Sequence, residues 1–273
     1  RDTDRSRGLG DVYKRQGILR RRTGGMDSGT RGIYPPNGKQ QQRYGSLRCH
    51  ISTGNFGYKI SKNTNKITIG VIDAETIVDG EKGVLKLKHI DLICDMIQEL
   101  VPQAKIIKYV LDDNTAESLA KGINELVSRG VDIINVSMGI SSDNKELSTS
   151  IENATSKQIF VVCAAGNNFG DLLYPARYEK TISCLARSIN GEDLYKDFAK
   201  ITKMSFSAPG IHVPFSDDYF SGTSIACAYV TSQFAYAIVE KGSLDYEELF
   251  VKMQNSAVDS SEKSYGVIQM SML

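Results

Sequence analysis

The sequence has few of the residues that build disulfide or metal-bound frameworks. Its 273 residues include 5 cysteines and 3 histidines, and no two cysteines form a CxxC pair. An odd, unpaired set argues against a disulfide framework, and the histidines lack ligand-like spacing, so we expect no metal site. Four cysteines lie in apolar settings and are expected to be free, buried thiols: Cys94, Cys163, Cys184 and Cys227. The missing disulfide pattern favours a reducing, cytoplasmic location.

Long hydrophobic runs, nucleotide-binding motifs and net charge are also lacking. No stretch reaches 18 apolar residues, so no membrane-spanning helix is expected. Neither GxxxxGK(S/T) nor GxGxxG occurs, which disfavours a nucleotide-binding protein. The formal net charge of +1 argues against binding to nucleic acid. The length and the 41% hydrophobic content instead suit one large α/β domain or two small ones, with a buried core.

Charge is distributed unevenly along the chain. Residues 1–48 carry 12 Lys and Arg against 4 Asp and Glu and show no apolar periodicity. A basic arm that binds nucleic acid or lipid is one interpretation. We favour a disordered basic leader over residues 1–66. Residues 7–16 (RGLGDVYKRQ) resemble the translated read-through of a sequencing adapter, so residues 1–16 are expected to be non-native, with Met26 a candidate for the natural start.

After the leader, short apolar runs alternate with helix-like segments. The runs rich in β-branched residues predict strands at Ile67–Ile72, Lys105–Val110, Val131–Val136, Ile159–Cys163 and Thr181–Ala186. Apolar periodicity predicts helices at His89–Leu100, Ala116–Ser128, Lys145–Lys157 and Ile225–Val239. Such alternation indicates a parallel sheet covered by helices on both faces. In these sheets, functional residues gather at the carboxyl ends of the strands.

One serine stands where a nucleophile is favoured. Ser224 opens a helix beside Gly222, so the helix dipole and free backbone N–H groups would stabilise an oxyanion. The simpler interpretation is that Ser224 or Thr223 only caps this helix. No histidine follows Ser224, which excludes the α/β-hydrolase order, while the order Asp73, His89, Ser224 is the one found on a parallel α/β sheet. His89 alone would be read as a polar residue at a helix start.

Several segments together resemble the subtilisin-like serine peptidases (subtilases) over residues 67–270. The matching segments, in order, are IGVID (69–73), HIDLICDMIQELVPQAKII (89–107), INVSMG (134–139), AAGN (164–167), FSAPG (206–210), SGTSIA (221–226) and YGVI (265–268). The resemblance implies a three-layer α/β fold with a mostly parallel central sheet and helices on both faces. It places a peptidase domain at residues 67–273.

The resemblance also implies the site. Ser224 would attack the peptide carbonyl, His89 would transfer its proton, and Asp73 would orient the imidazole. Asn167 would donate to the oxyanion. An extended peptide or protein substrate would bind along Ser137, Gly139, Ala165 and Gly166. No cofactor is expected: only 16 positions separate Asp73 from His89, so the calcium-binding loops of relatives are expected to be missing. We expect a monomer.

Two departures from the family pattern raise an alternative. Ala74-Glu75 stands where Thr or Ser followed by Gly is usual, and Ile90-Asp91 stands where Gly-Thr is usual. The first crowds a bend, and the second places a carboxylate near the base, where it could raise the imidazole pKa or compete for the ring. The alternative to a serine endopeptidase is therefore a catalytically inactive, peptide-binding relative. A third class, nucleic-acid binding through the basic arm, predicts salt-sensitive binding that disappears on deleting residues 1–48.

Overall fold

The computed structural model describes residues 66–168, 170–188, 205–241, 245–258 and 264–268. The predicted leader, residues 1–66, lies outside the described residues except for Lys66. Its boundary with the predicted domain at residues 67–273 therefore stays a prediction.

The described residues are organised around an eight-stranded sheet with the strand order β11-β12-β8-β7-β6-β5-β1-β4. Neighbouring strands are parallel except for the pair β11–β12. The strands are β1 (Ile67–Ala74), β4 (Ala104–Leu111), β5 (Ile133–Val136), β6 (Phe160–Ala164), β7 (Ile182–Arg187), β8 (Ser205–Pro209), β11 (Ala257–Val258) and β12 (Ser264–Ile268). Five of them correspond to the predicted strands, with bounds that differ by at most two residues. The predicted mostly parallel sheet is confirmed.

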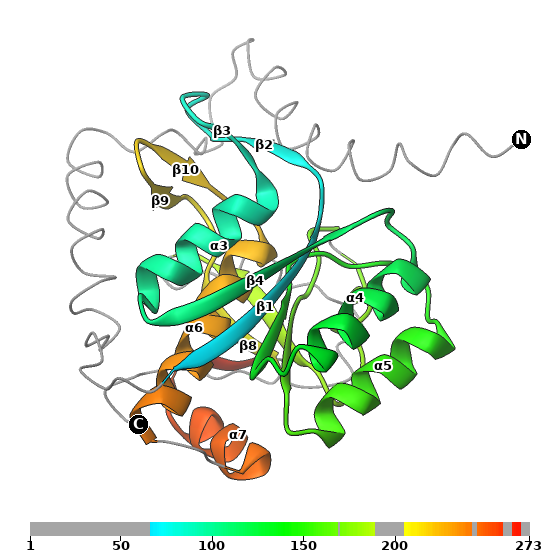
Figure 1. The fold of residues 1–273 in the computed structure, drawn as a ribbon. Helices are drawn as coiled ribbons and strands as arrows, with labels where there is room; N and C mark the ends of the chain where they lie inside the picture. Colours follow the sequence, from blue (N-terminus) through cyan, green and yellow to red (C-terminus); the bar gives the residue numbers. More distant parts are fainter. Residues whose placement is uncertain (1–65, 169, 189–204, 242–244, 259–263, 269–273) are drawn as a thin grey trace, which may run out of the picture. The chain divides into compact units, whose positions relative to one another are not determined.

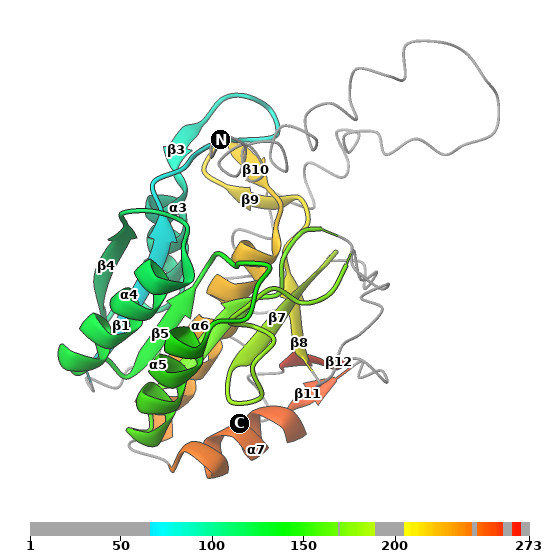
Figure 2. The same ribbon diagram turned by 90° about the vertical axis from the view of Figure 1, so that its right-hand side faces the viewer.

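Helices cover both faces of this sheet (Figures 1 and 2). They are α3 (His89–Leu100), α4 (Ala116–Ser128), α5 (Lys145–Ser156), α6 (Thr223–Lys241) and α7 (Tyr246–Asn255). Helices α4 and α5 pack together on one face, and α3 packs against α6 on the other. The three-layer α/β architecture is thus confirmed.

Local sequence explains why the helices form where they do. In α4, Thr115 caps the N-terminus by accepting a hydrogen bond from the backbone N–H of Ser118 at 3.1 Å. Leu119, Ile123 and Leu126 then repeat along one side of the helix and are fully buried against the sheet. This apolar stripe packs α4 against β1 and β4.

Two short hairpins stand outside the main sheet. The first joins β2 (Ile77–Asp79) to β3 (Lys86–Lys88), and the second joins β9 (Val213–Phe215) to β10 (Asp218–Phe220). The β2–β3 hairpin occupies the interval between Asp73 and His89. The β9–β10 hairpin immediately precedes α6 and Ser224.

The sheet register brings the ends of three strands to one edge. Ile72 of β1 pairs with Val136 of β5, and Val136 pairs with Cys163 of β6. The residues that follow these positions, Asp73, Ser137 and Ala164, therefore lie side by side at the carboxyl ends of the three strands. The sequence predicted functional residues at this edge.

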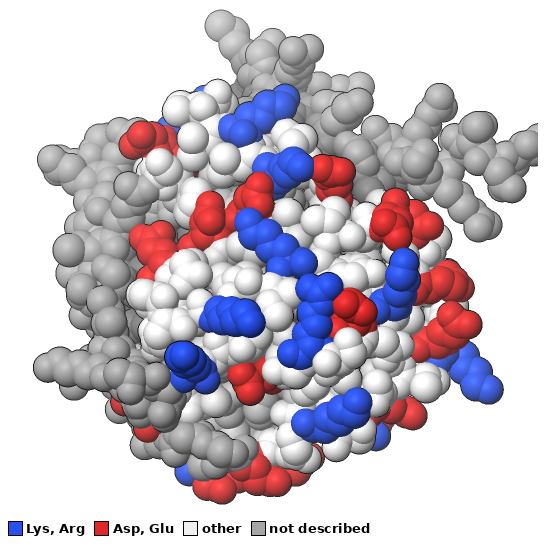
Figure 3. Space-filling model, viewed as in Figure 1, with Lys and Arg blue, Asp and Glu red and all other residues white. Residues whose placement is uncertain are grey.

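The surface of the described residues carries both signs of charge. Figure 3 shows Lys and Arg interspersed with Asp and Glu over the face that includes α3, β4 and α4. Ion pairs join several of them, among them Lys108–Asp91 at 2.7 Å and Arg129–Glu125 at 2.9 Å. Among the described helices, none is both long enough and apolar enough to cross a bilayer.

Candidate active site

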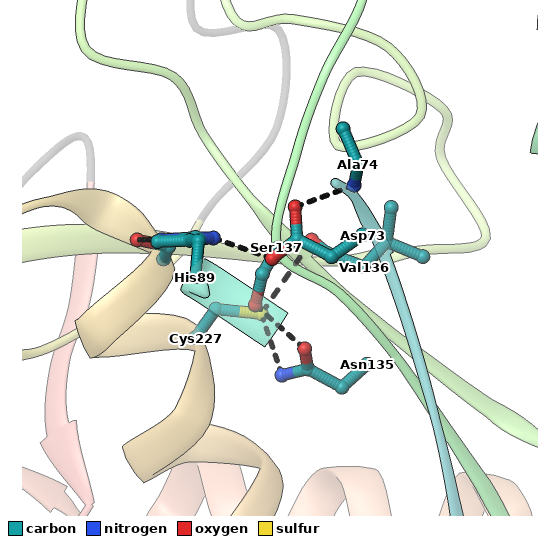
Figure 4. A network of polar contacts seen from close by, with 8 residues as sticks. Asp73, Ala74, His89, Asn135, Val136, Ser137 and Cys227 are labelled. Carbon is teal, nitrogen blue, oxygen red and sulfur yellow. Dashed lines mark hydrogen bonds and ion pairs between the residues drawn. The ribbon is translucent and has the colours of Figure 1, made fainter. Parts of the chain in front are cut away.

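Asp73 lies near the end of β1 with its carboxylate almost fully buried. Its Oδ1 accepts a hydrogen bond from the backbone N–H of Ala74 at 2.8 Å. Its Oδ2 contacts Nδ1 of His89, the first residue of α3 (Figure 4). A buried carboxylate needs such partners, since an unpaired charge in the interior is costly. The backbone N–H of Ala74 fixes one oxygen and leaves the other directed at the ring.

His89 contacts both neighbours of the predicted triad. While Nδ1 faces Asp73, Nε2 lies 2.9 Å from Oγ of Ser224. With the proton on Nδ1 donated to the carboxylate, Nε2 is left as the acceptor for the serine hydroxyl. The backbone N–H of His89 also donates to the carbonyl of Thr76 at 2.8 Å, which anchors the helix start to the chain leaving β1.

Ser224 occupies the first turn of α6 and is 5% exposed. Gly222, immediately before the helix, leaves the approach to its hydroxyl open. A Cβ added to Gly222 would lie 3.2 Å from Ser224 Oγ and 3.5 Å from Asn167 Nδ2. The position beside Gly222 is therefore close to both the Ser224 hydroxyl and the Asn167 amide nitrogen. Acyl transfer requires a nucleophile and an oxyanion donor placed around one such position.

Thr223 orients the amide of Asn167. Its backbone N–H and its hydroxyl each donate to Asn167 Oδ1 at 3.0 Å. With the carbonyl oxygen engaged, the amide nitrogen is directed toward Gly222 and Ser224. The Thr223 hydroxyl also accepts from the backbone N–H of Gly166 at 3.1 Å. Sequence reasoning took Thr223 only as an alternative helix cap, because this contact joins residues 56 positions apart.

Ser137 is placed beside this site, but its hydroxyl faces inward. It donates to Asn135 Oδ1 at 2.7 Å, and Asn135 Nδ2 donates to Cys227 Sγ at 3.2 Å and to Thr231 Oγ1 at 2.8 Å. Figure 4 shows Ser137, Asn135 and Cys227 gathered beside Asp73 and His89. This buried network ties the end of β5 to α6 and engages the hydroxyl of Ser137 inside the fold.

Gly139, Ala165 and Gly166 form two segments that continue from β5 and β6. Ala165 and Gly166 are buried, and Gly139 is partly exposed. Both segments are hydrogen-bonded to the stretch that contains Leu173 and Tyr174. The predicted substrate-binding residues are therefore brought together near Ser224, with Leu173 as a neighbour that the sequence did not indicate.

The unusual flanking residues pair with lysines at the surface. The carboxylate of Asp91 accepts from Lys108 Nζ at 2.7 Å, and that of Glu75 accepts from Lys88 Nζ at 2.6 Å. Each of these carboxylates thus has a cationic partner of its own. Neither Glu75 nor Asp91 separates His89 from Ser224, because Nε2 of His89 and Oγ of Ser224 are within hydrogen-bond distance.

A second acid–histidine–serine cluster adjoins the site and was missed from the sequence. Ser221 Oγ donates to Glu81 Oε1 at 2.5 Å, and Glu81 Oε2 contacts Nδ1 of His212. The backbone N–H of His212 donates in turn to Ser221 Oγ at 2.8 Å. Glu81 belongs to the β2–β3 hairpin, so this cluster joins the Asp73–His89 interval to the loop before Ser224. Over the described part of the chain, no group of three or more His, Cys, Asp or Glu is arranged to bind a metal.

This three-layer α/β fold, with Asp73, His89 and Ser224 in contact beside the carboxyl end of β1, is of the subtilisin-like type. The model of the subtilase family (Peptidase S8) matches residues 64–267, about three quarters of the chain. The chain belongs to this family.

Two of the curated relatives that the chain matches come from Bacillus subtilis (strain 168). The chain is 28% identical over 205 residues to the Minor extracellular protease Epr, an alignment that covers 68% of this chain and 31% of the relative. It is 33% identical over 157 residues to the Major intracellular serine protease, covering 51% of this chain and 48% of the relative. The chain thus spans less than half the length of either relative.

Solved structures share the fold at low identity. The protease domain of PatA matches with a TM-score of 0.62 and 19% identity, over 78% of this chain and 95% of that one. A lanthipeptide protease matches with a TM-score of 0.67 and 15% identity, over 85% of this chain and 95% of that one. These matches support the subtilisin-like architecture.

Proposed function

We propose that this protein is a serine endopeptidase in which Asp73, His89 and Ser224 form the catalytic triad. The observation that carries the proposal is the position of His89, whose two ring nitrogens contact Asp73 and Ser224. Family membership supports a serine-type peptidase. The assignment of the triad to Asp73, His89 and Ser224 rests on the contacts made in this chain.

The geometry supports a double-displacement mechanism. Ser224 Oγ attacks the scissile carbonyl carbon while His89 Nε2 takes the hydroxyl proton. The C–N bond of the tetrahedral intermediate then breaks, and His89 returns the proton to the leaving amine. Water, activated by the same imidazole, hydrolyses the acyl-enzyme and regenerates Ser224. Asp73 stabilises the imidazolium that forms in each half of the cycle.

Asn167 supplies the oxyanion donor. Its amide nitrogen is directed at the point that also lies near Ser224 Oγ, and backbone N–H groups at the start of α6 add the positive end of the helix dipole. A preorganised donor stabilises charge that develops only in the transition state, so it raises kcat more than it lowers KM.

The substrate that fits this arrangement is an extended peptide. The segment Ser137–Gly139 leaves β5 beside Ser224, where a peptide can add as a strand and bond through its backbone. We propose that the protein acts as a monomer, with no cofactor, through its own side chains. Contacts made by the substrate backbone would give affinity without demanding a particular sequence.

The competing function is a peptide-binding protein that has lost catalysis. It was suggested by Glu75 and Asp91, which replace residues usual in the family. Both carboxylates pair with surface lysines, and the His89–Ser224 contact is intact. These observations favour the active enzyme.

A serine-directed fluorophosphonate separates the two. We expect the wild-type protein to be labelled and to hydrolyse casein, and both signals to be lost in Ser224→Ala and His89→Ala. Losses of about 10⁴-fold or more in kcat are typical of triad variants. Thr149→Ala, at an exposed position on α5, serves as the matched control and should label normally. A wild-type protein that is folded by circular dichroism and never labels contradicts the proposal.

A further inference from the structure

One carboxylate joins the segment that leads to the candidate base with the segment that leads to the candidate nucleophile. Glu81 lies in the turn of the β2–β3 hairpin, whose second strand runs directly into His89 at the start of α3. Its backbone N–H donates to the carbonyl of Tyr219 in β10 at 2.9 Å, and the two hairpins lie side by side (Figures 1 and 2). Glu81 is therefore held against the chain that precedes α6.

The side chain of Glu81 bridges the two ends of the β9–β10 hairpin. Its Oε1 accepts from Ser221 Oγ at 2.5 Å, and its Oε2 contacts Nδ1 of His212. His212 stands just before β9, and Ser221 stands just after β10. The backbone N–H of His212 donates to Ser221 Oγ at 2.8 Å. Glu81, His212 and Ser221 thus contact one another pairwise, and we call them the bridging cluster.

His212 has an uncommon backbone conformation within the bridging cluster. Its φ is +50°, in the left-handed region that residues other than glycine seldom adopt. Such a conformation persists where surrounding contacts fix it, and it is concentrated near functional sites. Here the contacts are the hydrogen bond from the His212 N–H to Ser221 and the ring contact with Glu81. They fix the point at which the chain turns into β9.

The bridging cluster adjoins the residues that set the start of α6. Gly222, next to Ser221, donates through its backbone N–H to the carbonyl of Gly210 at 2.8 Å. The carbonyl of Gly222 in turn accepts from the N–H of Ile225 at 3.1 Å, inside the first turn of α6. A Cβ added to Gly210 would lie 2.8 Å from the carbonyl oxygen of Gly222, so the two segments are in close contact. The position of Ser224, two residues after Gly222, is therefore linked to that of Ser221.

We propose that Glu81 is a positioning residue for the peptidase reaction, an inference that rests on the proposed function. By holding Ser221, Glu81 fixes the chain that enters α6, and this keeps Ser224 Oγ at 2.9 Å from His89 Nε2. A displacement of reacting groups by about 1 Å lowers a rate by about 10²-fold. Because Glu81 belongs to the hairpin that leads into His89, one carboxylate couples the two segments between which the proton is transferred.

Kinetics normalised to the active sites that the fluorophosphonate titrates test this role. For Glu81→Ala we expect kcat per titrated site to fall about 10- to 100-fold with KM little changed. Glu81→Gln keeps an oxygen that can accept from Ser221, so it should retain more of the rate. Asp79→Ala is the matched control, since Asp79 is an exposed carboxylate of the same hairpin, paired with Lys86 at 3.4 Å. It should leave kcat unchanged.

A double-mutant cycle tests whether Glu81 acts through Ser221. Ser221→Ala should lower kcat by a factor similar to that of Glu81→Ala, because each variant removes the same hydrogen bond. The double variant should then lose no more than about the larger single loss. Losses that multiply in the double variant would contradict a shared role.

The outcomes distinguish this inference from the proposed function. A Glu81→Ala variant with wild-type kcat per titrated site overturns the positioning role and leaves the triad standing. So does a loss confined to KM or to the free energy of unfolding, as a merely structural contact would give. A folded wild-type protein that never labels overturns both proposals. If Glu81→Ala does not fold, Ser221→Ala and Glu81→Gln decide, and unchanged kcat in both contradicts the positioning role.

Discussion

At the scale of single residues, the candidate site depends on side chains that fix one another's orientation. Asp73 sets the imidazole of His89, and Thr223 sets the amide of Asn167. In both pairs the oriented group is a polar side chain with two chemically different ends. A partner that engages one end leaves the other directed at the reacting atoms.

The Thr223–Asn167 pair predicts a graded loss of activity. Thr223→Val removes the hydroxyl that donates to Asn167 Oδ1, while the backbone N–H donor remains. We expect kcat to fall about tenfold with KM little changed, less than the 10²- to 10³-fold loss expected for Asn167→Ala and known for this donor in subtilisin itself. Thr223→Ser, which keeps the hydroxyl, should restore most of the rate. Steady-state kinetics decide, and a change confined to KM would contradict the orienting role.

At the scale of elements, the β2–β3 hairpin is docked onto the β9–β10 hairpin by one buried carboxylate. Asp218, 1% exposed, accepts from the backbone N–H of Lys82 at 2.7 Å, Val84 at 2.8 Å and Leu85 at 3.0 Å. The contact is close, since a Cβ added to Gly80 would lie 2.1 Å from the Asp218 carboxylate. The hairpin between Asp73 and His89 is thereby attached to the loop that precedes Ser224.

This docking makes a prediction about pH. Burial raises the pKa of Asp218, but the backbone N–H groups of Leu85, Lys82, Tyr219 and Val84 outweigh burial and hold the pKa below its ordinary value. The stabilisation is therefore fully present above the unfolded carboxyl pKa of about 3.9 and is lost as pH falls through the lower folded pKa. Urea melts from pH 7 to 3 should show a stability loss below pH 4 that Asp218→Asn diminishes.

The same variant tests the docking at neutral pH. An amide can accept only part of what the carboxylate accepts, so Asp218→Asn should lower the free energy of unfolding by about 1 to 3 kcal/mol at pH 7. Asp217→Asn, at the exposed neighbouring position, is the matched control and should leave stability nearly unchanged. Equal effects of the two variants would contradict the assignment to Asp218.

At the scale of the whole molecule, local patterns predicted the architecture but not the contacts between distant segments. Helices α3 and α4 begin and end where the apolar periodicity predicted, because each carries a buried apolar stripe in its own sequence, and α4 also has the Thr115 cap. The order of Asp73, His89 and Ser224 also predicted their meeting at one sheet edge. The contacts of Leu173 and Asp218 were not predicted, because each has backbone partners that only the fold brings close, up to 136 residues away for Asp218.

Four thiols were predicted to be free and buried from their apolar settings, and the structure confirms this. Their reactivity can test whether the described residues unfold as one cooperative unit. They lie in two strands of the sheet and in two helices: Cys163 in β6, Cys184 in β7, Cys94 in α3 and Cys227 in α6. Burial raises the pKa of Cys94 to about 12 and that of Cys227 well above its usual value. All four are buried and therefore out of reach of a thiol reagent in the folded protein, and for Cys94 and Cys227 the raised pKa also disfavours the reactive thiolate.

We therefore expect Ellman's reagent to react with these four thiols at one common rate, set by global unfolding. A single cooperative domain exposes α3, the central strands and α6 together, so the rate should rise in parallel for all four as urea is added. A Cys49→Ser background removes the thiol outside the described residues, and mass spectrometry of quenched samples assigns each site. If Cys94 were modified faster than Cys163 and Cys184 in the absence of urea, α3, and with it His89, would open independently of the sheet. That result would mean that the Asp73–His89 contact is made and broken while the rest of the fold stays intact.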